Sequence, residues 1–491
     1  MSAHSSSHGG RHSSHGKQHT NRLFLWILLL SGAAAVAVLS ANRYLLSAHV
    51  LDSPILPHED AEPLNLRIHV ADERLLRLVV EECAKREESI IWLDKEGQMV
   101  VQEALDFKQC PTMDVLLPGR DRDLTTCTDI ALYVMHTGAR IMPLLQAVDM
   151  ERYNTGCGAA TARMFWHTMY PQFIANRPDV LHVMLVDHNQ LLVDDARLHR
   201  HMNVFLCKTR VCLELMQRHV IKMGYRGHVW LMGHTSSDPS VDVRQGTQGK
   251  DLSFLHIKGR SPLRHTQQLL RCWASQPEFP RLTVVGAFTW DEVKEYGDAI
   301  NIRFLPQVNQ DTLPDQPPRL LVPTELRQLQ ADSPVHICPS QSEGWGHTIN
   351  EARAVGAVVL TTDHPPMNEF VSKAKGPGLV IPVERLLAYR ELALAKYEPL
   401  DALIDEAQLC DVVESVLQMP AQEVYERGQQ ARTNFLYEKA VFMARMQDLR
   451  AFLEQRAQGL QGFEQRLGLG DDGGLMQQRQ LLEEQPSLPA V

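Results

Sequence analysis

The sequence predicts an α/β fold with two doubly wound parallel-sheet domains, preceded by one N-terminal transmembrane helix. Apolar runs alternate with helical patterns along most of the chain, and a second series of such runs begins near Gly227. An uncharged apolar segment lies near the amino terminus. With 491 residues, of which 44% are hydrophobic, the chain is long enough for two or three domains.

The amino-terminal region divides into a tail, an apolar segment and a stem. Residues 1–22 are rich in His and Ser and lack acids, so we expect a disordered cytosolic tail. Residues 23–41 carry no charge and would span roughly 28 Å as a helix, which matches a bilayer. Basic residues precede this segment and acids dominate the stem at 42–63, so the positive-inside bias predicts a single-pass type II protein of the Golgi or ER membrane with a luminal body. A cleavable signal peptide is the alternative, because Ala33 to Ala35 are small.

The remaining chain is expected to contain two similar domains with a cleft between them. Continuous apolar runs are typical of parallel strands that are buried on both faces. In the first domain, 64–226, the expected strands are 64–70, 89–94, 112–119, 139–148, 180–187 and 203–209. In the second domain, 227–436, they are 228–233, 253–259, 281–288, 301–306, 335–340, 357–362 and 378–383. A closing amphipathic helix at 437–467 and a disordered tail at 468–491 are expected to follow.

The most informative stretch is 335–363, where a strand, a glycine loop, a helix and a second strand are expected. Ligands bind at the carboxyl ends of strands in such sheets, and exposed amides at a helix start attract anions. Gly344 and Gly346 would let the backbone approach a ligand closely. Glu343 lies in the loop and Glu351 two helical turns further on, so both carboxylates would border the cleft. The alternative is a helix-capping Glu343 and a solvent-facing Glu351.

A basic cluster follows another expected strand. Lys258, Arg260 and Arg264 lie around Gly259, just before a predicted helix. This position would bring positive charge to a second strand end, where it would bind an anion. An exposed basic turn without a ligand is the alternative.

The segment "EGWGHTINEA" (343–352) resembles the Glu-x7-Glu motif of the group 1 glycosyltransferases, which have the GT-B fold. The resemblance is strongest over 228–384. It implies two Rossmann-like domains that face a cleft, with the acceptor bound by the N-terminal domain and a nucleotide sugar by the C-terminal domain.

The resemblance also implies residue roles. Glu343 would contact the transferred sugar and Glu351 the nucleotide ribose. A basic pair with five residues between its members, here Lys258 and Arg264, would bind the diphosphate, although the commoner order of Lys and Arg is reversed. The expected catalytic residues are Glu343, Lys258 and Arg264. The expected donor-binding residues are Arg260, Gly259, Gly344, Trp345, Gly346, His347, Thr348 and Glu351.

The expected reaction moves a hexosyl group from a nucleotide-diphosphate sugar to a glycan, lipid or protein acceptor. Cations and helix amides would stabilise the leaving diphosphate, and Glu343 would orient the sugar as positive charge develops on it. The resemblance implies retention at the anomeric carbon. Because cations and helix amides would stabilise the leaving diphosphate, we expect no metal and no cofactor. The alternative is an inactive nucleotide-sugar-binding or scaffold protein of the same fold.

Weaker signals leave other interpretations open. Asp121 and Asp123 form an Asp-x-Asp triplet, which is a manganese motif in the other major glycosyltransferase fold or an ordinary exposed loop. Lys208 and Thr209 could face the cleft, or Thr209 could cap a helix. Residues 233–238 could form a hinge or a donor contact. His188 could be an acceptor-side group or an ordinary buried histidine.

Composition argues against several other protein classes. The net charge of -10 and the scattered Lys and Arg residues provide no basic field for nucleic acid. The motifs of P-loop NTPases, Gly-x-Ser-x-Gly hydrolases and His-Glu-x-x-His proteases are missing from the sequence. Nine cysteines without a Cys-x-x-Cys pair argue against a zinc module and allow at most a few disulfides.

Overall fold

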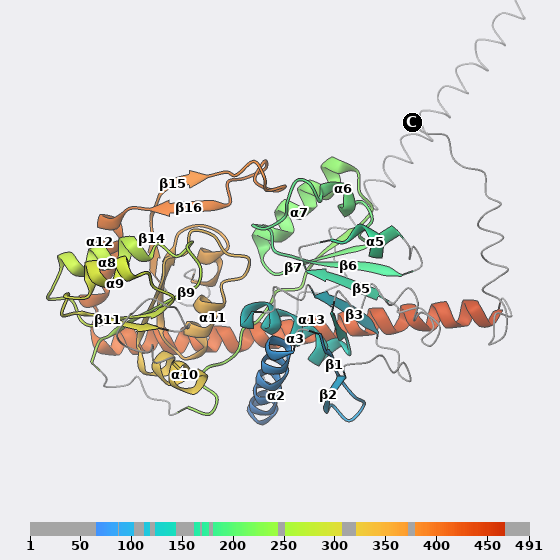
Figure 1. Ribbon diagram of the computed structural model, residues 1–491, viewed down its shortest axis with the longest axis horizontal. Helices are drawn as coiled ribbons and strands as arrows, with labels where there is room; N and C mark the ends of the chain where they lie inside the picture. Colours follow the sequence, from blue (N-terminus) through green and yellow to red (C-terminus); the bar gives the residue numbers. More distant parts are fainter. Residues whose placement is uncertain are drawn as a thin grey trace, which may run out of the picture. The chain divides into compact units, whose positions relative to one another are not determined.

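The computed structural model describes most of the chain after residue 64 (Figure 1). The described residues are 65–86, 88–102, 112–117, 123–143, 162–166, 169–175, 180–243, 251–306, 321–371 and 379–466. By its contacts the chain divides into 1–54 and 55–491, and every described residue belongs to the second unit. The predicted tails, transmembrane segment and stem lie outside the described residues. Within the described ranges, every helix is too short or too polar to cross a bilayer.

Two sheets of mainly parallel strands form the framework, which confirms the predicted α/β architecture (Figure 1). The first has, among the described residues, eight strands in the order β2-β1-β4-β3-β5-β6-β7-β8. Their bounds are β1 Ile90–Leu93, β2 Met99–Gln102, β3 Met113–Leu117, β4 Arg140–Pro143, β5 Ala162–Trp166, β6 Leu181–Val186, β7 Val204–Cys207 and β8 His228–Leu231. The accompanying helices are α2 Leu66–Lys85, α3 Leu124–Thr137, α5 Pro171–Ala175, α6 Ala196–His199 and α7 Arg210–Met223.

The second sheet has six described strands, all parallel, in the order β11-β10-β9-β12-β13-β14. The strands are β9 Phe254–Gly259, β10 Leu282–Gly286, β11 Ile302–Pro306, β12 Val335–Cys338, β13 Val358–Thr362 and β14 Leu379–Ile381. The helices are α8 Thr266–Ser275, α9 Trp290–Tyr296, α10 Pro323–Asp332, α11 His347–Ala354, the 3-10 helix η1 Met367–Phe370 and α12 Glu406–Leu417. The predicted basic cluster with Lys258 and Arg264 and the predicted glycine loop therefore follow β9 and β12, which are adjacent strands.

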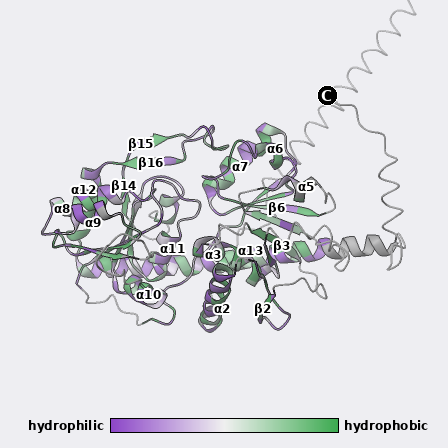
Figure 2. Cartoon of the chain, viewed as in Figure 1, coloured by the Kyte–Doolittle hydropathy of each residue, from purple (hydrophilic) through white to green (hydrophobic). Residues whose placement is uncertain are grey.

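The start of the first domain differs from the prediction, because the described part of the expected strand, residues 65–70, does not form a strand. They open α2, whose first turn is capped by Asn65, with its Oδ1 accepting hydrogen bonds from the amides of Arg67 and Ile68. The short alternation of polar and apolar residues in 64–70 continues as a helical pattern, and α2 buries one of its faces. The helix accordingly carries both hydrophobic and hydrophilic residues (Figure 2). Local alternation over seven residues was too short to distinguish strand from helix.

Two strands depart from the expected arrangement. β1 was expected to be a parallel strand, but it pairs antiparallel with both β2 and β4. β8 was expected in the second sheet, but it lies parallel to β7 at the edge of the first. Both segments form strands, as their apolar pattern predicts. Only the pairing of the strands differs from the prediction, because sequence pattern alone does not determine it.

One long helix links the two cores. α13, Ala421–Arg466, begins after Pro420 and not at residue 437, where the closing helix was predicted. Val424 near its start packs in the core of the second sheet, whereas Phe442 and Met446 pack in the core of the first. The helix therefore contacts both halves of the described chain.

A second connection is a strap formed by the hairpin of β15 Val383–Leu387 and β16 Asp401–Ile404 with the segment between them. The apolar residues of this segment, Leu394 among them, are buried in the core of the first sheet. The amide of Ala393 donates to the carbonyl of Leu191, and the amide of Val193 donates to the carbonyl of Glu391. The strap thus fastens the second half of the chain to the first.

Three disulfides lie among the described residues. Cys83–Cys127 joins α2 to α3, Cys207–Cys212 joins β7 to α7, and Cys272–Cys410 joins α8 to α12. Cys338, at the end of β12, is a buried free thiol. Disulfides persist mainly in oxidising compartments.

Candidate functional site

The loop between β12 and α11 is shaped by its glycines. Gly346 has φ 85°, a left-handed conformation that favours glycine, and directly precedes the first residue of α11. Gly344 packs so closely on the Asp187 carboxylate of the first half that a Cβ at this position would overlap it. Both glycines are therefore required by geometry, as the sequence predicted, although the close approach at Gly344 is to a side chain of the same protein.

Arg264 and Glu343, two of the predicted catalytic residues, are in direct contact. Arg264 Nη1 lies 2.5 Å from Glu343 Oε1, and it donates to Ser340 Oγ at 3.0 Å and to Thr348 Oγ1 at 2.8 Å. Ser340 in turn donates to Glu343 Oε1 at 2.7 Å. This hydrogen-bonded group joins the loop after β9 to the loop after β12. Ser340 was not singled out from the sequence, because a serine in a polar loop carries no specific signal.

Lys258 lies at the end of β9, but its partner comes from another helix. Its Nζ contacts Glu292 Oε1 and Oε2 of α9 at 2.7 and 2.8 Å. Burial opposes the charged form of Glu292, but the hydrogen bond and charge of Lys258 together with the hydrogen bonds from Thr289 outweigh it, so the pKa of Glu292 is lowered. Gly259 has φ 59°, and Arg260 is exposed at the surface. The predicted cations are thus near each other in the fold, and each of Lys258 and Arg264 is paired with a carboxylate.

Glu351 faces α10, where Gln330 Nε2 donates to its Oε2 at 2.8 Å. Burial raises the pKa of Glu351, against the lowering effect of His347 and of the Gln330 hydrogen bond. The Cys338 thiol lies close to this group: burial raises its pKa to about 12, and Arg264, Glu343 and Glu351 all influence it electrostatically. Glu343 thus contacts Arg264 in the loop after β12, and Glu351 contacts Gln330 of α10.

Trp345 and His347 make contacts within the protein. The Trp345 indole is buried against Phe370 and donates to Ser236 Oγ at 3.2 Å. His347 Nδ1 lies 2.9 Å from the same hydroxyl, and His347 Nε2 lies 2.8 Å from Asp129 Oδ1 of α3. Ser236 belongs to 233–238, which was left open between hinge and donor contact. Both side chains hold the glycine loop against the first half of the chain.

Asp129 is the centre of a buried ionic network that the sequence did not reveal. Lys208 Nζ lies 2.5 Å from Asp129 Oδ2 and 2.7 Å from Asp187 Oδ1, and His234 Nε2 lies 2.6 Å from Asp129 Oδ1. Burial opposes the ionised carboxylate, but Lys208 and the histidines outweigh it and hold the pKa of Asp129 well below its usual range. Burial lowers the pKa of His234 to about 4, which leaves this imidazole neutral.

Asp129, His234 and His347 each place one potential metal-ligand atom within 4.8 Å of the others. The contacts fit a metal poorly. Both imidazole nitrogens already point at Asp129 Oδ1, the Lys208 ammonium occupies the other oxygen, and His234 Nδ1 is buried without a hydrogen-bond partner among the described residues. A metal-bound histidine normally donates its second ring N–H to a partner. We therefore interpret the group as an ionic network.

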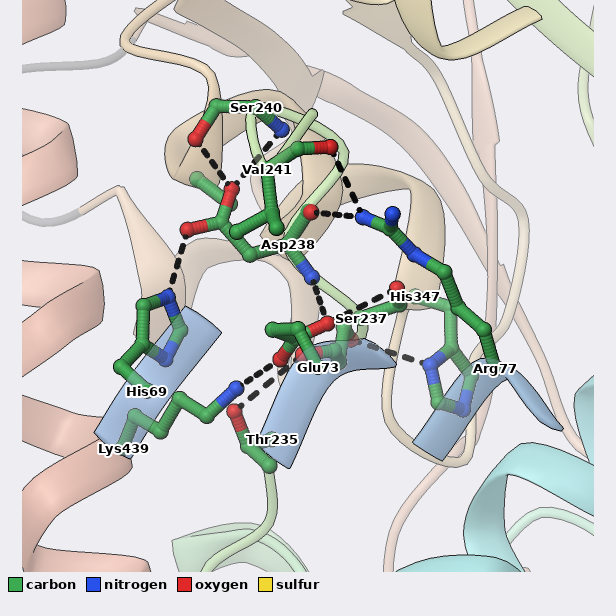
Figure 3. A network of polar contacts seen from close by, with 12 residues as sticks. His69, Glu73, Arg77, Thr235, Ser237, Asp238, Ser240, Val241, His347 and Lys439 are labelled. Atoms are coloured by element: carbon green, nitrogen blue, oxygen red, sulfur yellow. Dashed lines mark hydrogen bonds and ion pairs between the residues drawn. The ribbon is translucent and has the colours of Figure 1, made fainter. Parts of the chain in front are cut away.

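The linker from β8 towards β9 is held by a second polar network (Figure 3). His69 Nε2 of α2 lies 2.9 Å from Asp238 Oδ2, and Glu73 accepts hydrogen bonds from the Ser237 hydroxyl at 3.1 Å and the Asp238 amide at 2.9 Å. Lys439 of α13 forms an ion pair with Glu73. Helices α2 and α13 thus fix the start of the connection between the two sheets.

The weaker candidates are accounted for in part. Asp123 caps α3 by accepting from the Thr126 amide at 2.7 Å, whereas Asp121 lies outside the described residues. Thr209 caps α7, with its hydroxyl accepting from the Cys212 amide at 3.2 Å. His188 is buried, and burial lowers its pKa to about 4. The capping interpretation therefore holds for Thr209, whereas the cap formed by Asp123 was not predicted.

Comparisons with known proteins give one family. Residues 319–424 match the family described as glycosyl transferases group 1. The search of curated proteins gave no match.

Several solved structures are similar to the chain. The pneumococcal O-GlcNAc transferase GtfA, in complex with UDP and GlcNAc, is 14% identical, with 64% of this chain and 60% of that chain covered and a TM-score of 0.42. Sucrose-phosphate synthase from Thermosynechococcus elongatus is 12% identical, with 65% and 83% covered and a TM-score of 0.46. A glycosyltransferase from Rickettsia africae is 11% identical, with 71% and 99% covered and a TM-score of 0.45. The chain thus spans about three fifths of the GtfA chain.

The two sheets of mainly parallel strands form an α/β fold. The matched family segment includes β12, the glycine loop and α11, which carry the Glu343 and Glu351 pair. The match confirms the resemblance inferred from the sequence and the prediction of a glycosyltransferase at the level of this family. The chain is thus similar to the group 1 glycosyltransferases over residues 319–424.

Proposed function

We propose that the protein transfers a sugar from a nucleotide-diphosphate donor to a glycan, lipid or protein acceptor. The observation that carries the proposal is the contact of Arg264 with Glu343, which joins the loops after β9 and β12 within reach of the glycine-loop amides. A cation and a carboxylate at adjacent strand ends suit a substrate whose two parts develop opposite charge during the reaction.

Arg264 is the principal diphosphate ligand in this proposal. Its three contacts all use Nη1, and Nε and Nη2 have no partner among the described residues. Three N–H donors, one on Nε and two on Nη2, therefore remain for phosphate oxygens, with the guanidinium already oriented. Arg260 is exposed and adds a mobile positive charge nearby. Lys258 is held by Glu292 and provides a fixed positive charge at the end of β9.

Glu343 orients the sugar in the proposed reaction, and Glu351 binds the ribose. The Glu343 side chain is 11% exposed and lies beside Arg264, so it can face a sugar ring that gains positive charge. Gln330 holds Glu351 by one carboxylate oxygen. The proposal assigns the leaving-group charge to Arg264, Lys258 and the loop amides, which makes a metal unnecessary. Retention at the anomeric carbon belongs to the same proposal and comes from the family resemblance.

We also propose that residues 23–41 anchor the protein in the Golgi or ER membrane with residues 64–467 in the lumen. The three disulfides among the described residues support an oxidising compartment. Alkaline extraction of membranes and protease protection of the full chain test this. Release of the protein by carbonate, or cleavage of its body in sealed vesicles, would contradict the proposal.

A thermal-shift panel of UDP- and GDP-sugars tests donor binding, because a ligand that binds the native state raises the unfolding temperature. Donor hydrolysis should then be measured for wild type and for Glu343→Ala, with Glu414→Ala, an exposed glutamate of α12, as control. We expect hydrolysis to be lost only in Glu343→Ala. Binding without turnover in the wild type would favour an inactive scaffold, and no response to any donor would contradict the proposal.

A further inference from the structure

We propose that His347 is a positioning residue that holds the glycine loop in register with the first half of the chain, and is not a ligand of the donor. Its partners are Asp129 of α3 and Ser236 of the linker. The inference refines the proposed function, on which its catalytic consequence rests.

The imidazole of His347 has no ring nitrogen left for a substrate. Nδ1 lies 2.9 Å from Ser236 Oγ, and Nε2 lies 2.8 Å from Asp129 Oδ1. The side chain is 14% exposed. A nucleotide-sugar donor could contact either nitrogen only by breaking a buried hydrogen bond. The new contact would offset the free energy of the lost one and give no net gain in binding.

Asp129 is a fixed partner because its own position is set by several contacts. Lys208 holds Oδ2, and His234 shares Oδ1 with His347. The groups that influence the His347 imidazole are Asp129, Lys208 and Glu351. Burial disfavours the charged imidazole, but the charge and hydrogen bond of Asp129, together with the charge of Glu351, outweigh it and raise the pKa of His347. The contact is therefore a charge-assisted hydrogen bond in a buried setting.

The loop next to His347 is tied down residue by residue. His347 is the first residue of α11, Trp345 donates to the same Ser236 hydroxyl, and Gly344 packs on Asp187. Glu343 comes immediately before these positions and carries no comparable contact to the first half in the described structure. A displacement of His347 would therefore move the loop amides and Glu343 together. The ion pair of Arg264 with Glu343 lies within the second half and does not fix the loop to the first half.

Other contacts keep the two halves together when His347 is replaced. The strap buries Leu394 in the first core, and its Tyr397 hydroxyl lies 3.2 Å from His219 Nδ1. Glu369 of η1 accepts hydrogen bonds from the amides of Arg210 and Val211 at the start of α7. Loss of the His347 contacts should consequently loosen the glycine loop without separating the halves.

Hydrogen–deuterium exchange of the ligand-free full chain tests the inference directly, because it reports local opening. We expect His347→Phe, which keeps a ring but removes both hydrogen bonds, to increase exchange over 340–350. His347→Gln, whose amide can still donate to Asp129, should restore most of the protection. Asp129→Asn should increase exchange in the same segment, without adding to the effect of His347→Phe. The control Tyr397→Phe, which removes a contact between strap and first half, should leave 340–350 unchanged.

Binding and turnover give a second readout. If His347 positions the loop, His347→Phe should lower the kcat of donor hydrolysis about tenfold to a hundredfold, the range for a small misplacement of reacting groups, with a smaller change in KM. Unchanged exchange in His347→Phe, combined with weaker UDP or GDP binding, would identify a donor ligand and overturn the inference. A wild type that binds neither nucleotide would overturn the proposed function, and the exchange result would still decide the role of His347.

Discussion

Replacement of Arg264 by alanine perturbs the proposed donor site most directly. The substitution removes a guanidinium that contacts Glu343 Oε1 at 2.5 Å, Ser340 Oγ at 3.0 Å and Thr348 Oγ1 at 2.8 Å. It leaves Glu343 without its cation, with Ser340 still donating to the carboxylate. Stability and nucleotide affinity should both fall, for different reasons.

The stability loss follows from the burial of the pair. The side chains of Arg264 and Glu343 are 15% and 11% exposed. Breaking a fully buried pair costs about 3–5 kcal/mol and an exposed pair about 0–1 kcal/mol, so we expect a loss of about 2 kcal/mol here. Adding Glu343→Gln removes the orphaned charge, so the double variant should lose less than the sum of the two single variants.

The expected loss of nucleotide affinity follows from the guanidinium N–H groups that Arg264 would donate to the phosphates of UDP or GDP. A hydrogen bond to a charged group contributes about 1.5–3 kcal/mol, so UDP or GDP should bind roughly tenfold to a hundredfold more weakly to Arg264→Ala. Urea denaturation and calorimetric titration measure the two effects. Arg271→Ala is the matched control, because Arg271 forms an exposed pair with Glu406 in the same half. Equal stability losses in both variants, with unchanged nucleotide affinity, would refute the reasoning.

Two further predictions concern the buried network. Lys208→Met leaves Asp129 and Asp187 without their shared cation, so urea denaturation should show a loss of about 3–5 kcal/mol, and a loss below about 1 kcal/mol would contradict the ionic role of Lys208. The second concerns pH: since the folded-state pKa of His347 is raised, its contribution to stability should be complete below about pH 6.5 and disappear as pH rises through the folded pKa. The free energy of unfolding of His347→Gln, subtracted from that of the wild type at each pH, removes the titration of the other histidines. A difference that stays constant between about pH 6 and 9 would contradict this prediction.

The glycine loop was predictable because its signals are local. Strand, glycines, helix start and the Glu343 to Glu351 spacing all lie within 335–363, and the structure places them as β12, the loop and α11. The nearby basic cluster was also predictable, since Arg264 follows a strand that is adjacent to β12. What the pattern did not show is the partner of each group, such as Glu292 for Lys258, because these pairs come from different helices.

The missed features depend on contacts distant in sequence. Residues 64–70 alternate like a strand, yet the burial of His69 and Glu73 against Asp238 and Lys439 requires a helix there. β8 has a strand pattern that suits either sheet, and only its pairing with β7 decides.

The role of His347 also depended on the tertiary structure. Its position beside the glycine loop favoured donor binding, but its contact to Asp129 spans 218 residues of sequence. An interaction of that range leaves no periodic signal in a single sequence.

The central claim is that a nucleoside diphosphate binds between Arg264 and the glycine loop. A crystal structure of the protein with UDP or GDP measures this most directly. The account predicts phosphate oxygens within hydrogen-bond distance of the Arg264 guanidinium and of the amides that open α11, with the ribose at Glu351. Phosphates bound elsewhere, with Arg264 still engaged only with Glu343, Ser340 and Thr348, would contradict it.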